Sequence, residues 1–189
     1  MTSPEFLSVA LSFVLGLAVT LLITSFLCAF LERRATKFDW LPFVWALYIL
    51  AYQFDYWWES FQLIRAPGIT MMAFGCLLVL ALTLSFSGGL VLPSNIGKYP
   101  ADLADYFERD GRWGILGLGF YNVVGTLANK WLFNLNLVSG VTLVNLVSVA
   151  LVCVTVFSRS RRLQVTSTLA FGLNFIVFVT LYVPKSYQG

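Results

Sequence analysis

The chain has 189 residues, of which 59% are hydrophobic and only 11% are charged, against a charged share of about 25% in soluble domains. Most of it is therefore expected to lie in lipid, which leaves no separate soluble catalytic or nucleic-acid-binding domain. The sequence contains no histidine, which excludes histidine-based catalysis and histidine metal sites. We predict no metal, no cofactor and no nucleic-acid partner, and bound membrane lipid is compatible with this composition.

Six apolar segments are long enough to cross a hydrocarbon core of about 30 Å, which requires about 20 residues of helix. The sequence therefore predicts an all-α polytopic membrane protein, a six-transmembrane-helix bundle that forms a single membrane domain over residues 1–189. No family motif can be matched residue by residue. The predicted helices lie near 5–30, 40–63, 69–91, 113–134, 137–157 and 163–183.

The basic residues are concentrated in alternate loops between the predicted helices. Nine of the 12 Lys and Arg residues lie in the first, third and fifth loops, and the segment before the first helix has none. By the positive-inside rule the odd-numbered loops are cytoplasmic, and the N- and C-termini both lie outside. A signal peptide carries positive residues before its apolar segment, whereas here Glu5 lies before it and the positive residues follow it. We therefore expect the first segment to be a retained helix. We predict a multi-pass protein of a bacterial-type inner (plasma) membrane.

The 5–30 helix carries a row of small residues at every fourth position. Such rows let helix backbones approach each other closely in membranes. We therefore expect this face of the helix to be buried. The row consists of Ser8, Ser12, Gly16, Thr20, Thr24 and Cys28.

The 40–63 helix carries two acids well inside the predicted span, and the functional hypothesis depends on it. A charged carboxylate at the centre of a helix costs about 2.5–3.5 kcal/mol on insertion scales. Both acids are therefore expected to have partners or water rather than to face lipid. They belong to one stripe with alternating spacings of three and four residues. The stripe consists of Trp45, Tyr48, Tyr52, Asp55, Glu59 and Gln62.

Depth along the helices predicts a partner for Glu59. At about 1.5 Å per residue, Glu59 and Lys130 lie about 29 Å and 26 Å from the same inner surface. We therefore predict a structural ion pair between Glu59 and Lys130 near the outer side of the bundle. Arg65 is a competing partner for Glu59.

That pairing leaves Asp55, at a depth of about 22 Å, as the less compensated acid. Tyr48 and Tyr52 of the same helix and Asn122 of the 113–134 helix are expected to lie within its reach. We predict that these four residues form an ion or proton site. The alternative is an Asp55 that is protonated or bonded to tyrosine and that fixes the register of the helix.

The third loop is expected to contain a short amphipathic helix over 100–110. Pro100 stands at its first turn, Asp105 lies early, Arg109 lies late, and Gly111 is expected to end it. This helix is expected to lie in the membrane interface or against the inner ends of the bundle. It serves either as a linker or in gating or partner docking.

The last three predicted helices contain small and amide residues. In the 113–134 helix, one stripe is expected to pack closely against a neighbour. The stripe consists of Gly114, Gly117, Tyr121, Gly125 and Ala128. The two following helices each bring one amide to membrane depth, Asn145 and Asn174.

These features favour a small transporter or channel for protons, cations or a small solute, with a polar cavity between the 40–63 and 113–134 helices. The aromatic share of 16% suits an alternative, a structural or assembly subunit that binds lipid, a hydrophobic cofactor or partner helices. An enzyme acting on lipid is a third reading, with Asp55 and Glu59 as acid and base, and we do not expect it. We expect a homo-oligomer or a subunit of a membrane complex.

Overall fold

The computed structural model describes residues 3–31, 37–64, 70–94, 103–133 and 139–181. Within these ranges the regular elements are all helices, which confirms the all-α class. The chain divides into two compact units, Met1–Gly117 and Leu118–Gly189. We call them the first and second unit and describe each by itself.

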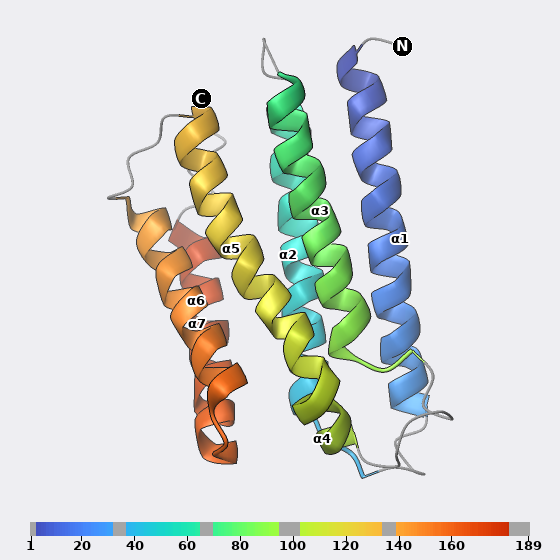
Figure 1. Ribbon diagram of the computed structural model, residues 1–189, viewed down its shortest axis with the longest axis vertical. Helices are drawn as coiled ribbons and strands as arrows, with labels where there is room; N and C mark the ends of the chain where they lie inside the picture. Colours follow the sequence, from blue (N-terminus) through green and yellow to red (C-terminus); the bar gives the residue numbers. More distant parts are fainter. Residues whose placement is uncertain (1–2, 32–36, 65–69, 95–102, 134–138, 182–189) are drawn as a thin grey trace. The chain divides into compact units, whose positions relative to one another are not determined.

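The first unit is a three-helix arrangement completed by shorter elements. Its long helices are α1 (Ser3–Leu31), α2 (Leu41–Ile64) and α3 (Met71–Val91). Figure 1 shows them side by side, and α1 packs against both α2 and α3 while α2 also packs against α3. The apolar core of this unit includes Leu11, Leu15, Leu22, Ile49, Leu77 and Leu84.

Side-chain oxygens fix where several helices begin. The Asp39 carboxylate accepts a hydrogen bond from the backbone N–H of Leu41 (3.0 Å) at the start of α2. The hydroxyl of Thr70 accepts one from the Ala73 N–H (3.2 Å) at the start of α3. Such caps satisfy N–H groups that have no partner inside the helix.

A continuous helical segment runs from α4 (Leu103–Tyr106) through the π-helical turn η3 (Phe107–Gly111) into α5 (Arg112–Phe133). The expectation that Gly111 ends a helix is therefore wrong. The Arg112 N–H bonds to the Phe107 carbonyl, which carries the chain through the turn. A Cβ at Gly111 would lie 3.2 Å from the Val91 carbonyl oxygen, so the glycine permits close packing on α3 instead.

Among the described residues, four helices are long and apolar enough to cross a membrane: Leu7–Leu31 within α1, Met71–Val91, Gly140–Phe157 and Arg161–Leu181. The chain is thus compatible with a multi-pass membrane protein. The helices α2 and α5 are not among these four, although they contain 24 and 22 residues. They are also the two helices that carry the residues of the predicted ion or proton site.

The small-residue row of α1 is not the buried face of this helix, so that expectation is wrong. Gly16, Thr20 and Thr24 are exposed, and the face that packs on α2 and α3 carries Leu11 and Leu22. The Thr20 hydroxyl donates to the Gly16 carbonyl, and the Thr24 hydroxyl donates to the Thr20 carbonyl, both at 2.7 Å. Because these hydroxyls are satisfied within their own helix, they need no neighbouring helix.

The second unit contains most of α5 together with α6 (Gly140–Phe157) and α7 (Arg161–Leu181). The helices α6 and α7 pack along each other. A Cβ at Gly119 of α5 would lie 2.9 Å from a methyl group of Val152 of α6. The glycine therefore allows α5 and α6 to approach closely.

Candidate functional site

The side of α2 that packs against α3 contains bonded polar groups. The Gln53 side-chain amide donates to the Leu84 carbonyl of α3 (3.3 Å), and the Tyr56 hydroxyl donates to the Leu77 carbonyl (2.6 Å). On α2, Ile49, Gln53 and Tyr56 follow one another at spacings of four and three residues, so they share one face. Two interhelical hydrogen bonds thus fix α2 on α3.

The predicted stripe of α2 lies beside this face, about 100° around the helix axis. Trp45 and Tyr52 are buried. Tyr48 and Asp55 are partly buried, and Glu59 is exposed. The stripe thus changes from buried to exposed along its length, and the two acids occupy its more open part. The side chain of Gln62 and all of Arg65 lie outside the described residues.

Asp55 and Glu59 stand four residues apart, so their Cβ atoms lie about 5–6 Å from each other on the helix surface. The described residues of the first unit offer neither carboxylate a hydrogen bond or an ion pair. This contrasts with Gln53 and Tyr56 one stripe away. Asp55 and Glu59 are thus two acids of α2 for which the described residues of the first unit supply no partner.

Gln53 is a polar residue of the same helix that the sequence pattern did not single out. Its side chain is 1% exposed, and among the described residues its Oε1 atom has no hydrogen-bond partner. A Cβ at Gly88 of α3 would lie 3.2 Å from its Nε2 atom, so α3 approaches the amide closely. The signal available in the sequence was a glutamine four residues after Ile49, on a stripe that also holds Tyr56 and Ser60.

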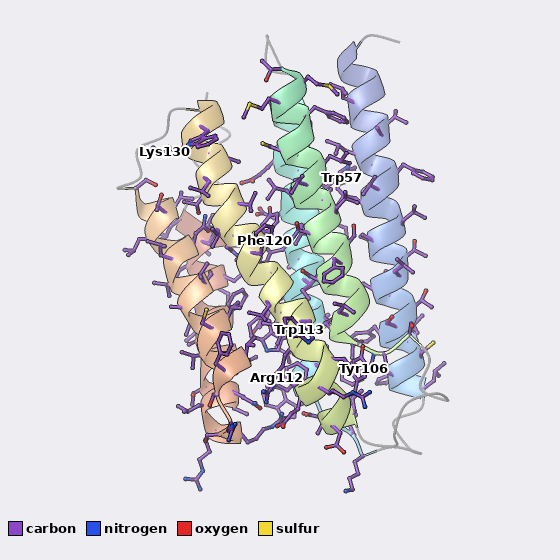
Figure 2. All side chains as sticks on the ribbon, viewed as in Figure 1. Trp57, Tyr106, Arg112, Trp113, Phe120 and Lys130 are labelled. Atoms are coloured by element: carbon purple, nitrogen blue, oxygen red, sulfur yellow. The ribbon has the colours of Figure 1, made fainter. Side chains whose placement is uncertain are left out.

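Asn122 and Lys130 belong to the second unit. Asn122 is 2% exposed, and its side-chain amide donates to the Leu118 carbonyl of its own helix (2.9 Å). Lys130 is exposed and stands near the C-terminal end of α5, opposite the end that holds Arg112 and Trp113 (Figure 2). The contacts predicted between Asn122 and Asp55 and between Lys130 and Glu59 stay predictions.

Two other amides of the second unit, Asn145 and Asn174, connect helices. Asn145 of α6 donates to the Thr126 hydroxyl of α5 (3.1 Å). Asn174 of α7 donates to the Val144 carbonyl (3.0 Å) and the Ser148 hydroxyl (2.8 Å) of α6. These hydrogen bonds give both amides a structural role.

The end of the first unit near α4 also contains paired polar groups. The Tyr106 hydroxyl donates to the Leu90 carbonyl of α3 (3.0 Å), and Tyr106 lies at this end of the helical segment in Figure 2. Arg109 pairs with Asp110 (3.0 Å), and Arg112 pairs with Glu108 (3.6 Å). The charged residues of η3 thus pair with one another and with Arg112, the first residue of α5.

No group of three or more His, Cys, Asp or Glu side chains suited to a metal ion occurs within the described parts of the chain. Searches of protein families, of characterised proteins and of solved structures find no match to this chain. The functional argument therefore depends on the chemistry and position of its own residues, above all on the two acids of α2.

Proposed function

We propose that the chain is a small integral membrane transporter or channel for protons, cations or a small solute. The observation that carries this proposal is the difference between polar groups within α2. Gln53 and Tyr56 bond to α3, whereas the described part of the first unit provides no ion pair or hydrogen bond for Asp55 and Glu59. An ionisable residue inside a membrane helix is expensive to retain and therefore marks a candidate functional site.

In this proposal Asp55 is the group that exchanges a proton or binds a cation, and Tyr48, Tyr52 and Asn122 surround it in a polar cavity between α2 and α5. Glu59 forms a structural ion pair with Lys130. The charge cost of about 2.5–3.5 kcal/mol for an acid at the helix centre supports hydration or pairing of both carboxylates. Transport requires such hydration, because an ion crosses hydrocarbon only where polar groups or water replace its solvent shell.

The proposed topology has six spanning helices, with α2 and α5 added to the four apolar ones. An even number of spans places both termini on one side, and the basic residues of the odd-numbered loops place those loops in the cytoplasm. A bacterial-type inner membrane is the proposed location. Polar α2 and α5 are then the spans that line the pathway, while the four apolar helices contact lipid.

A structural or assembly subunit is the second candidate, and the aromatic residues of α2 favour it. Phe54, Trp57 and Trp58 are all exposed in the isolated chain, although the Trp57 indole N–H also donates to the Ser12 hydroxyl of α1 (3.2 Å). Large aromatic side chains on one helix suit contact with lipid or with partner helices.

Flux measurements on the purified chain in liposomes test the transport proposal. Proton and cation fluxes are followed with pH- and cation-sensitive dyes inside the vesicles, with protein-free liposomes as the control. Flux above that control is expected for at least one ion or solute. The assembly role would be favoured if the flux of every tested ion and solute equalled the control and native mass spectrometry, after mild detergent purification, showed a foreign subunit.

A further inference from the structure

The turn between α6 and α7 gathers positive charge at the surface of the second unit. Arg159, Arg161 and Arg162 lie within four residues of one another, and all three are exposed. We call Ser158–Arg162 the basic turn. It joins two of the four helices that are long and apolar enough to cross a membrane, so it belongs at a membrane surface.

The second unit cannot neutralise this charge itself. From residue 118 to residue 189 the sequence contains no Asp and no Glu. Arg109 of η3 and Arg112 at the start of α5 differ in this respect, since Arg109 lies 3.0 Å from Asp110 and Arg112 lies 3.6 Å from Glu108. Both groups of arginines are in loops assigned to the same membrane side, but only the basic turn stands in an acid-free unit.

The backbone of the basic turn is fixed by a buried amide. Gln164 is 0% exposed, and its Nε2 atom donates to the Ser158 carbonyl (3.1 Å). Its Oε1 atom accepts a hydrogen bond from Arg161 (3.4 Å), and the Ser160 N–H donates to the Ser158 hydroxyl (3.1 Å). Because the turn is held in this way, the arginines are presented from a preorganised backbone, which lowers the ordering cost of binding an anion.

Apolar side chains flank the arginines on both sides. Phe157 at the end of α6 is 73% exposed, and Leu163 in the first turn of α7 is 52% exposed. A guanidinium group recognises phosphate through paired, charge-assisted hydrogen bonds. A ligand that offers a phosphate beside an acyl chain can therefore use both kinds of side chain, whereas a soluble anion can use only the arginines.

We propose that the basic turn binds the headgroup of an anionic phospholipid, with Arg159 and Arg162 contacting the phosphate and Phe157 and Leu163 contacting the adjoining acyl chain. Arg161 also contributes its charge while it bonds to Gln164. This interaction is independent of the transport proposal. It anchors the α6–α7 pair at the lipid surface.

The test compares phospholipids with identical acyl chains. The purified full-length chain in neutral detergent is titrated with phosphatidylglycerol or phosphatidylcholine, and binding is followed by thermophoresis. Phosphatidylglycerol is expected to bind at least tenfold more tightly. Replacing two arginines in R159Q/R162Q should weaken its binding about 30-fold, which corresponds to about 2 kcal/mol. Arg161 is kept so that its bond to Gln164 is retained.

The matched control is R109Q, which removes an exposed arginine that already has an acidic partner. It should retain wild-type affinity for phosphatidylglycerol. Equal losses in R109Q and R159Q/R162Q, or wild-type affinity in R159Q/R162Q, would overturn the proposal. So would displacement of phosphatidylglycerol by equimolar inorganic phosphate, which would identify a site for soluble anions.

A measurement on the unaltered chain avoids any effect of substitution on folding. Added sodium chloride should weaken phosphatidylglycerol binding, because salt screens charges at exposed sites. Binding of phosphatidylcholine should change little. Phosphatidylglycerol affinity that is independent of salt would contradict headgroup recognition by the arginines.

Discussion

The contact between α3 and the start of α5 can be tested with single methyl groups. A Cβ on Gly114 would lie 2.7 Å from the Ser87 carbonyl oxygen and 2.8 Å from the Val91 backbone nitrogen. These are backbone atoms of a helix and cannot turn away. Gly114→Ala should therefore force α3 and α5 apart or strain both helices.

The matched control is Gly75→Ala in α3, where a Cβ would meet no described atom within 4 Å. Each substitution gains up to about 1 kcal/mol from helix propensity, and this gain cancels in the comparison. Overpacking at Gly114 costs about 1–3 kcal/mol. The Gly114→Ala chain should therefore be less stable than the Gly75→Ala chain by about 1–3 kcal/mol in the free energy of unfolding, measured by circular dichroism during denaturation in SDS.

Gly117 provides a second comparison at the same crossing. A Cβ there would collide with the Ser87 hydroxyl, while the Ser87 Cα would lie 3.6 Å away. Ser87→Ala should therefore restore stability to Gly117→Ala but not to Gly114→Ala. Equal stability of the Gly114 and Gly75 variants, or equal rescue of both α5 variants by Ser87→Ala, would refute this account of the contact.

Two further predictions concern the polar contacts. Asn174→Ala removes two hydrogen bonds between α7 and α6 and should cost about 1 kcal/mol of unfolding free energy. Thr180→Ala loses only hydrogen bonds within its own helix and should cost less, and equal costs would argue against an interhelical role of Asn174. In a double-mutant cycle, Glu59→Gln and Lys130→Gln should show a coupling energy of about 0.5 kcal/mol or more. Additive effects of the two substitutions on the free energy of unfolding in SDS would argue against the proposed ion pair.

The helical class of the protein could be predicted from the sequence, because apolar segments of about 20 residues have few other stable forms. The pattern predicts a helix over 40–63, and α2 covers Leu41–Ile64. Close packing at Gly114 and Gly117 is also confirmed by the short approach to α3. Gly125 of the same stripe has no described atom within 4 Å of a Cβ position, so the stripe packs closely over only part of its length.

Which face of a helix is buried could not be predicted so well. In α1 the small-residue row permits close approach but does not require it, and larger residues such as Leu11 and Leu22 form the contact instead. Gly111 fits a helix end or a crowded helix interior equally well from the sequence alone. Its role is decided by α3, whose Val91 carbonyl lies beside it, and such a partner is not visible in local sequence.

The candidate site could be predicted to the level of its helix. Two acids in an apolar segment single out α2, but the bonded stripe with Gln53 and Tyr56 depends on carbonyls of α3. Backbone carbonyls carry no signature in the sequence. The structure was therefore needed to show that one face of α2 is hydrogen-bonded to α3 and that the two acids lie on the neighbouring face.

The most direct test of the central claim is the ion flux of an Asp55→Asn chain in liposomes. The matched control is Asp105→Asn, which makes the same substitution at an exposed carboxylate of α4. The account predicts that Asp55→Asn abolishes the flux of the wild-type chain while Asp105→Asn retains it, with both variants correctly inserted. Wild-type flux through the Asp55→Asn chain would contradict the assignment of Asp55 as the group that binds the ion or proton.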